Sequence, residues 1–321
     1  MPVQNISNVA VLGLGTMGHG IAQTFALAGY TVRGFDDVAA ACDTLVERVR
    51  INLQAFVRAG LLSADKIEPT LARISAHSSI AAAVAGADFV TEAVKECLPT
   101  KQSLFAELEA LVRPGTILAS NSSSFPISQS AATMRDRSHA LVTHWFNPPH
   151  LVPLVEVVPG PDTTEATTET TMAVMADIGK QPLRLRKELP GFLVNRIQVA
   201  IMREIWDLLE QGVASAEEID AAIRGSIGFR LAAVGPLEVH DFGGLDIQAA
   251  VFRNLAPEIR DGSELPKVVD DLVSQGHFGP KSGRGFYEYS PARTAERRDR
   301  RDQLFLSLVK LLHPDTVKGN S

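Results

Sequence analysis

The chain has 321 residues, 45% of them hydrophobic and 21% charged, a composition typical of a globular protein with room for two domains. Its formal net charge of −6 excludes the basic surface that nucleic-acid binding requires. Two cysteines, Cys42 and Cys97, provide neither a disulfide framework nor a zinc site, so we expect no metal and a reducing, cytoplasmic setting. The longest nearly uncharged stretch, residues 80–87, falls far short of the roughly 20 residues that span a bilayer, so no membrane partner is expected.

Short β-branched runs alternate with helical patterns through the first half of the chain. This alternation is typical of a parallel sheet with helices on both faces. We therefore predict an α/β fold, a Rossmann-type doubly wound and mostly parallel sheet. The expected strands are residues 9–12, 31–36, 88–94, 116–120 and 140–145, with two more at the sheet edge, 154–158 and 182–185.

The pattern changes after Pro190, where helical periodicity replaces strands. Residues 192–209 carry apolar side chains at helical spacing, and Ser215 with Glu218 forms a capping-box signature for the next helix. A charged run and a leucine-rich stretch near the chain end predict an amphipathic tail helix. The expected domains are residues 1–189 and an all-helical domain of residues 190–321.

Three glycines follow the first expected strand and open a helix. Gly13 permits a tight turn, Gly15 lets the backbone approach a pyrophosphate, and Gly18 allows close packing of helix and strand. The helix N-terminus offers free N–H groups to the phosphates. Asp36, 18 residues after Gly18, ends the second strand, where a carboxylate accepts both ribose hydroxyls. The spacing predicts a dinucleotide site.

The acid at the second strand also selects the dinucleotide. A carboxylate at Asp36 repels the 2′-phosphate of NADP, and Asp37 adds to the repulsion. Arg33 precedes the acid, whereas a phosphate-binding arginine is expected after it. NAD is therefore the predicted cofactor.

A histidine and a glutamate are candidates for acid–base chemistry. His144 ends an expected strand, at the sheet edge where ligands bind in doubly wound folds. Glu156 lies in the next strand, and a turn at residues 147–149 would bring the two side by side. A carboxylate on one ring nitrogen leaves the other as a general base. A purely structural pair is the alternative on these residues alone.

Six motifs, in this order, resemble those of the L-3-hydroxyacyl-CoA dehydrogenase family. They are GLGTMGHGIA, TEAVKECLPTK, ASNSSSFPI, THWFNPPHLVPLVEVV, ELPGFLVNR and HFGPKSGRGFYEY. The resemblance implies an NAD-dependent dehydrogenase that oxidises a CH–OH group and dimerises through its C-terminal domain. It implies that His144 is the base, Glu156 its partner, and Ser123 and Asn195 the residues that bind the substrate oxygens; adjacent Ser122 and Ser124 leave the serine open. The implied cofactor-binding residues are Gly13, Gly15, Thr16, Met17, Gly18, Asp36, Glu96, Lys101, Asn147 and Lys281.

Two departures from the family pattern bear on the substrate. The lysine by which CoA-using members meet the CoA phosphates is replaced by Ala59, with Arg58 beside it. The segment around Arg230 is longer than in those members and is similar to the non-CoA branch, which includes L-gulonate 3-dehydrogenase (lambda-crystallin), carnitine dehydrogenase and a pyridine-aldehyde dehydrogenase. These relatives handle free carboxylates, so Arg230 is the expected carboxylate-binding residue, with a surface helix cap as its alternative role.

Three functions stay open at this level. The favoured one is an NAD-dependent dehydrogenase of a small hydroxy acid, and the second is a 3-hydroxyacyl-CoA dehydrogenase, which Arg58 leaves possible. The third is a non-enzymatic, lens-type structural role. The intact set of Ser123, His144, Glu156 and Asn195 argues against that third function, because a storage protein does not need it.

Overall fold

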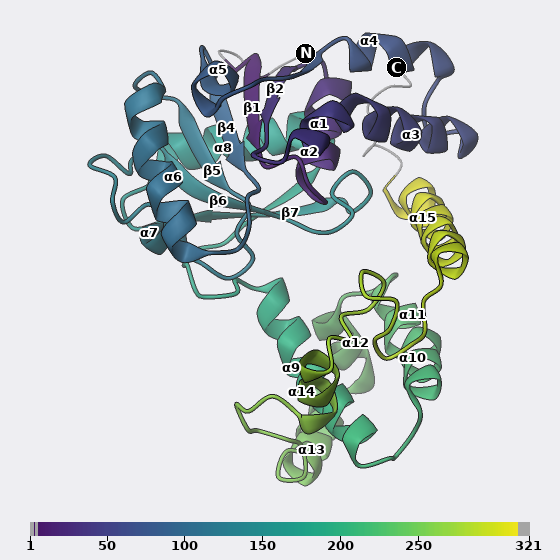
Figure 1. Cartoon of the computed structure of the whole chain (residues 1–321). Coiled ribbons are helices and arrows are strands. Elements are labelled where there is room, and N and C mark those ends of the chain that lie inside the picture. Colours follow the sequence, from purple (N-terminus) through teal and green to yellow (C-terminus); the bar gives the residue numbers. More distant parts are fainter. Residues whose placement is uncertain (1–2, 4–5, 314–321) are drawn as a thin grey trace. The chain divides into compact units, whose positions relative to one another are not determined.

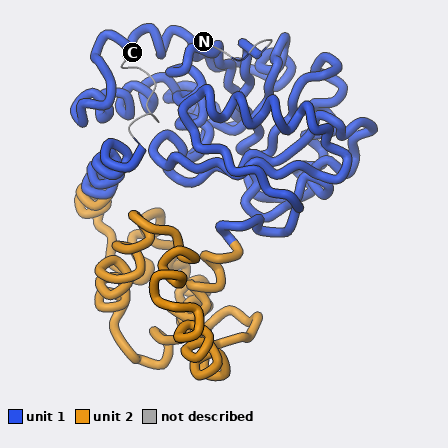
Figure 2. The backbone as a smooth tube through the Cα atoms, turned by 180° about the vertical axis from the view of Figure 1, so that it is seen from behind, with its two compact units in different colours: residues 1–195, 299–321 blue, residues 196–298 orange. Residues whose placement is uncertain are grey.

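The computed structural model describes Val3 and residues 6–313 (Figure 1). Its contacts separate two compact units. One holds the chain up to Asn195 together with the segment from Asp299 onward, and the other holds Arg196–Arg298 (Figure 2). No helix in the described part of the chain is long and apolar enough to cross a membrane.

A single eight-stranded sheet forms the centre of the first unit. Its spatial order, β3-β2-β1-β4-β5-β6-β7-β8, begins with the 3-2-1-4-5-6 order of doubly wound dinucleotide-binding folds. All neighbours pair in parallel except β6 and β7, which are antiparallel. The strands are β1 (Asn8–Leu12), β2 (Thr31–Phe35), β3 (Ile74–Ala76), β4 (Phe89–Glu92), β5 (Ile117–Ser120), β6 (Ala140–Trp145), β7 (Leu154–Pro159) and β8 (Gln181–Arg184).

The sheet confirms the predicted fold class. Each of the seven expected strands is present, with ends that differ by a few residues at most. The additional strand, β3, escaped the sequence reading because it spans Ile74–Ala76 alone and only Ile74 among its residues is buried.

Helices cover both faces of the sheet and build two apolar layers. Ile21, Leu53 and Val174 pack on one face, and Phe105 and Ile127 pack on the other. The helices of this unit are α1 (Gly18–Leu27), α2 (Ala39–Asp43), α3 (Leu45–Arg58), the 3₁₀ turn η1 (Ala64–Lys66), α4 (Ile67–Leu71), α5 (Ile80–Val84), α6 (Leu98–Leu111), α7 (Ile127–Ser130) and α8 (Glu165–Asp177).

The second unit is helical, as the sequence predicts. Ser215 and Glu218 form the expected capping box, in which each side chain binds the other residue's backbone N–H. The helices of this part are α9 (Val194–Glu210), α10 (Ala216–Gly225), α11 (Ile227–Leu231), α12 (Pro236–Gly243), α13 (Leu245–Leu255) and α14 (Lys267–Ser274).

The tail helix α15 (Pro291–Leu312) ends in the first unit. Leu306 and Val309, which are 4% and 5% exposed, join the apolar layer that also contains α1 and α3 residues. At the other junction Phe192 is buried among residues of the sheet layer. Apolar side chains beyond residue 189 thus join the apolar layers of the first unit. The domain ranges 1–189 and 190–321 stay a prediction.

Candidate active site

The glycine loop follows β1 and turns sharply into α1. Gly13 has a φ of +89°, and a Cβ there would lie 2.5 Å from the Ala93 carbonyl oxygen, so only glycine fits. A Cβ on Gly18 would collide with the carbonyl oxygen of Gly13. Gly15 has no such neighbour within 4 Å and faces open space. The loop thus offers bare backbone at the start of α1, with exposed Thr16 and half-buried Met17 at the helix start.

Asp36 joins the glycine loop to the end of β2. Its Oδ2 accepts the Leu14 N–H at 2.6 Å, and its Oδ1 accepts the Val38 N–H at 2.8 Å. Arg33 is directed elsewhere, donating to His77 and to the Ala85 carbonyl. Among the described residues Arg33 thus contacts His77 and Ala85 and not Asp36.

A pocket of about 600 Å³ lies beside this loop, where the sequence predicts the dinucleotide. Gly13, Gly15, Asp36 and Asp37 form part of its wall, so bare backbone and two carboxylates face the same space. The remaining lining residues are Leu12, Phe35, Ile80, Ala93, Val94, Lys95, Thr100, Ser103, Leu104 and Glu107.

Arg48 is a contact to the glycine loop that the sequence reading missed. From α3 its guanidinium donates to the Gly15 carbonyl at 3.2 Å and to the Ala41 carbonyl at 2.7 Å. An arginine on an amphipathic helix carries no motif, so only the packing of α3 beside the loop reveals this contact.

His144 and Glu156 form a buried pair across β6 and β7. They are direct partners in the antiparallel register, and His144 Nδ1 lies 2.7 Å from Glu156 Oε2. The other carboxylate oxygen accepts the N–H groups of Leu193 and Val194 at 3.1 and 2.9 Å. For His144 Nε2 the described residues provide no hydrogen-bond partner. The geometry therefore orients the ring through Nδ1 and leaves Nε2 available for a proton.

Two aromatic rings flank the histidine. The ring centroid of His144 lies 4.5 Å from that of Phe146 and 5.4 Å from that of Phe192. Apolar walls restrict water around the imidazole, and a water-poor site strengthens the interaction with Glu156.

The loop that carries Asn147 accepts hydrogen bonds from a buried lysine. Lys180 Nζ donates to the carbonyls of Pro149 and Val152 at 2.6 and 2.8 Å and lies 5.5 Å from the centre of the Trp145 ring. Burial lowers the pKa of Lys180 to about 7. Asn147 itself is exposed, next to the end of β6.

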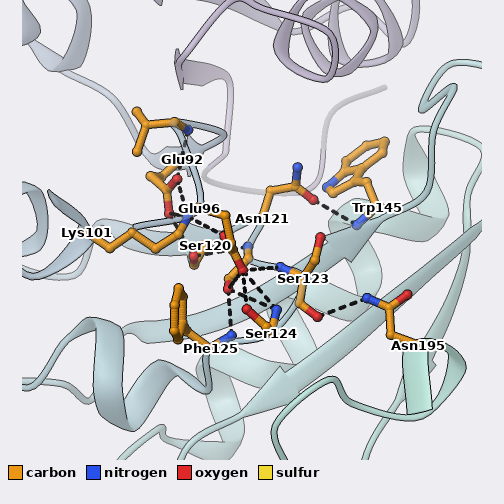
Figure 3. A network of polar contacts seen from close by, with 12 residues as sticks. Glu92, Glu96, Lys101, Ser120, Asn121, Ser123, Ser124, Phe125, Trp145 and Asn195 are labelled. Carbon is orange, nitrogen blue, oxygen red and sulfur yellow. Dashed lines mark hydrogen bonds and ion pairs between the residues drawn. The ribbon is translucent and has the colours of Figure 1, made fainter. Parts of the chain in front are cut away.

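The serine loop after β5 lies around the carboxylate of Glu96 (Figure 3). The hydroxyls of Ser122 and Ser124 donate to Glu96 at 2.6 and 2.8 Å, and the backbone N–H groups of Ser123 and Ser124 do so at 2.9 Å. Burial alone would raise the pKa of Glu96, but hydrogen bonds from Ser122 and Ser124 and the charge of Lys101 outweigh it and lower that pKa.

Ser123 differs from its two neighbours in its hydroxyl, which has no hydrogen-bond partner among the described residues, whereas those of Ser122 and Ser124 donate to Glu96. Like Ser124, Ser123 is exposed. Its carbonyl accepts a hydrogen bond from Asn195 Nδ2 at 2.9 Å. The structure thus brings Ser123 and Asn195 together and leaves the Ser123 hydroxyl available.

Lys101 lies next to Glu96, another predicted cofactor residue. It is fully buried, and its Nζ contacts both Glu92 and Glu96. Arg230 and Lys281 are exposed side chains of the second unit, Arg230 on α11 and Lys281 with its Nζ 5.1 Å from the Phe278 ring centre. Their roles toward NAD or substrate stay predictions. Among the described residues no group of three or more His, Cys, Asp or Glu side chains is arranged to hold a metal ion.

Two family models together match most of the chain. The NAD-binding domain of 3-hydroxyacyl-CoA dehydrogenase matches residues 8–189, and the C-terminal domain of the same enzyme matches residues 191–289. The chain belongs to the 3-hydroxyacyl-CoA dehydrogenase family. It is accordingly an NAD-dependent dehydrogenase that acts on a CH–OH group, as the sequence motifs imply.

Similar proteins come from both branches of the family. The chain is 33% identical over 310 residues to 5-formyl-3-hydroxy-2-methylpyridine 4-carboxylate 5-dehydrogenase of Mesorhizobium japonicum, covering 96% of this chain and 98% of that protein. A crystal structure of a dehydrogenase of that name, described as an NAD⁺-dependent dismutase, superposes with a TM-score of 0.89, at 31% identity over 96% of this chain and 98% of that one.

Two further relatives bear on the choice between branches. The 3-hydroxyadipyl-CoA dehydrogenase of Escherichia coli is 38% identical over 293 residues, which cover 91% of this chain and 61% of that protein. Lambda-crystallin of Oryctolagus cuniculus is 35% identical over 232 residues, covering 72% of this chain and 73% of that protein. The family is thus established, and the substrate is a separate question.

Proposed function

We propose that the protein oxidises the secondary alcohol of a small L-3-hydroxy acid that carries a free carboxylate. The buried His144–Glu156 pair, with Nε2 available, is the observation that carries the acid–base part of this proposal. The near-full-length similarity to a pyridine carboxylate dehydrogenase supports the free acid.

Each residue of the proposed site has a defined role in this reaction. His144 Nε2 takes the proton of the substrate hydroxyl, and Glu156 stabilises the imidazolium that forms. The Ser123 hydroxyl and the Asn195 amide hydrogen-bond the same substrate oxygen and hold the carbinol carbon in place. NAD, when bound, supplies the acceptor for the hydride. The glycine loop, Asp36 and Asp37 hold its adenosine half, and Asn147 and Lys281 are proposed for its other half.

A CoA thioester is the second candidate substrate. The 38% identity to a 3-hydroxyadipyl-CoA dehydrogenase favours it, and Arg58 at the end of α3 is exposed beside Ala59, where it is accessible to a phosphate.

One panel of substrates separates these candidates. NAD reduction is measured with L-gulonate, carnitine and 3-hydroxybutyrate beside 3-hydroxybutyryl-CoA, and NADH oxidation with acetoacetyl-CoA. Turnover of a free acid at least tenfold above that of the thioesters supports the proposal, and the reverse ratio supports the CoA alternative. Binding of NAD without turnover of any of them would contradict both candidates and indicate a different substrate.

The preference for NAD is expected to depend on Asp36. We expect NAD to bind at least about tenfold more tightly than NADP, a difference of about 1.4 kcal/mol. Asp36→Ala should narrow this ratio, because it removes the charge that repels a 2′-phosphate. The substitution should also weaken the binding of NAD, since Asp36 accepts hydrogen bonds from the Leu14 and Val38 N–H groups and so orders the loop. Calorimetric titration with both cofactors measures the two effects, and equal affinities in the unmutated protein would contradict this role.

We further propose that the protein is a homodimer through its C-terminal domain. Phe229, Leu237, Phe242 and Phe252 of the second unit are between 71% and 81% exposed, an apolar surface that a partner subunit would cover. Sedimentation equilibrium at micromolar concentration should give twice the 34.5 kDa of one chain. A single species at 34.5 kDa would refute the dimer.

A further inference from the structure

Glu92 and Lys101 are buried ionisable side chains near the serine loop, and neither takes part in the proposed proton or hydride transfer. Glu92 ends β4 and is 1% exposed; Lys101 lies on α6 and is fully buried. Lys101 Nζ lies 2.7 and 2.9 Å from the two oxygens of Glu92 and 3.3 Å from Glu96 Oε2 (Figure 3). Removing charges from water is costly, so such a pair calls for a structural explanation.

The contacts of Lys101 direct its charge at two carboxylates. Its Nζ donates hydrogen bonds to both oxygens of Glu92 and forms an ion pair with Glu96 Oε2. Because its side chain is fully buried, its charge acts on Glu92 and Glu96. The NAD contact that the family motifs imply for Lys101 stays a prediction.

Glu92 fixes the strand ends on which the site is built. Its Oε1 accepts the Val94 N–H at 2.8 Å, and its Oε2 accepts the Ser120 hydroxyl at 2.7 Å. Ser120 Oγ in turn accepts the Ser122 N–H at 3.2 Å. The ends of β4 and β5 are therefore tied to one buried carboxylate.

Glu96 holds the serine loop in place through hydrogen bonds. Four donors of Ser122, Ser123 and Ser124 converge on its Oε1, while Lys101 lies at its Oε2. Such convergence requires an ionised carboxylate held in one orientation, and Lys101 supplies the charge that holds it. The hydroxyls of Ser122 and Ser124 both donate to Glu96, so only the Ser123 hydroxyl of the three is available to a substrate.

We infer that Glu92 and Lys101 are positioning residues that act through Glu96 to select Ser123 as the hydroxyl presented to the substrate. The inference rests on the proposed function, because it assigns Ser123 to the substrate oxygen. The same loop is tied to the rest of the site through Asn195, which donates to the Ser123 carbonyl, and through Asn121, whose Oδ1 accepts the Trp145 N–H next to His144.

The test removes both charges of the pair together, so that no unpaired charge stays buried. In Glu92→Gln/Lys101→Met we expect kcat at saturating NAD to fall about 100-fold, the cost of a misplaced positioning group. Amide hydrogen exchange across residues 122–125 should accelerate at least about tenfold as the loop loosens.

Two results would overturn the inference. A kcat within threefold of the unmutated value at saturating NAD would make the pair merely structural. A tenfold loss of NAD affinity, with kcat retained at saturating NAD and loop exchange unchanged, would show that Lys101 acts only as a cofactor contact.

Two more variants keep the test decisive if the double variant does not fold. Glu96→Gln changes a side chain that is 36% exposed, and it should also lower kcat at saturating NAD; an unchanged kcat and loop exchange overturn the inference. Ser120→Ala and Thr116→Val each remove a buried hydroxyl from the region of β5, but Thr116 donates to the Ala87 carbonyl at the opposite end. Only Ser120→Ala should lower kcat, and equal effects of the two would also contradict it.

The assay is run with whichever substrate the unmutated enzyme turns over, including 3-hydroxybutyryl-CoA. Failure of the free-acid proposal then appears in the substrate profile of the unmutated protein. Failure of the positioning inference appears only in the variants, and the hydrogen-exchange measurement needs no substrate.

Discussion

His144→Ala should lower kcat by about 10²–10⁴-fold, the usual contribution of a general base. The affinity for NAD should stay nearly unchanged, because the glycine loop and Asp36 lie at the ends of β1 and β2. Steady-state kinetics at saturating NAD, with a separate titration of cofactor binding, distinguishes the two effects. A variant that keeps most of its activity would remove His144 from the mechanism.

His139→Ala is the matched control. His139 precedes the other end of β6 and contacts the Thr167 hydroxyl at 3.0 Å, so its loss should reduce stability slightly without a change in kcat. Equal loss of activity in both variants would indicate damage to β6 rather than loss of a base.

Glu156→Gln should cost nearly as much activity as His144→Ala. Glu156 Oε1 is occupied by the Leu193 and Val194 N–H groups, so the amide nitrogen of Gln would face His144 Nδ1. Nδ1 must then accept, which places the proton on Nε2, the nitrogen that has to be free as a base. A smaller loss than about tenfold would show that the ring keeps its tautomer without the carboxylate.

The sheet and the His144–Glu156 pair can both be predicted from the sequence. Buried parallel strands are short apolar runs separated by helices, and this pattern identifies β1, β2, β4, β5 and β6 almost to the residue. Glu156 lies 12 residues after His144, and a turn between them at Asn147–Pro149 makes the two direct partners in the β6–β7 register. Local spacing was sufficient because the contact is made by adjacent strands.

The contacts that sequence reasoning missed are those between elements distant in the chain. Nothing near Lys101 in the sequence indicates that its charge is buried against Glu92, because α6 must first pack on β4. Likewise, Arg48 donates to the Gly15 carbonyl, 33 positions earlier in the chain, and this contact forms only once α3 packs beside the glycine loop. Leu306 and Val309 of the tail helix join the apolar layer that contains α1 and α3 residues, and amphipathicity predicts such a buried face but not what covers it.

The choice among the three serines has the same origin. Ser122, Ser123 and Ser124 are chemically identical, and only the position of Glu96 distinguishes them, by occupying the hydroxyls of the first and third. Selection of a catalytic hydroxyl is here a consequence of a hydrogen-bond network rather than of a motif.

Arg230→Met should raise KM for a hydroxy acid by about 10–100-fold, equivalent to about 1.4–2.8 kcal/mol of binding. A carboxylate removed from water without a cation costs several kcal/mol, so a free-acid substrate requires a cation where it binds. His144 cannot serve, because the base must begin neutral. Lys101 cannot serve either, since it is fully buried against Glu92 and Glu96.

The guanidinium of Arg230 meets the chemical requirement. It is exposed on α11, it makes no ion pair with any described residue, and its planar fork suits bidentate binding of a carboxylate. Arg224→Met is the control, because Arg224 is an exposed arginine of the neighbouring helix α10 that pairs with Asp220 at 3.7 Å; its KM should not change. An Arg230→Met enzyme that binds the acid normally would contradict the carboxylate contact. If the same variant kept full activity toward a thioester as well, the CoA alternative would gain from the result, because a thioester presents no carboxylate for Arg230 to neutralise.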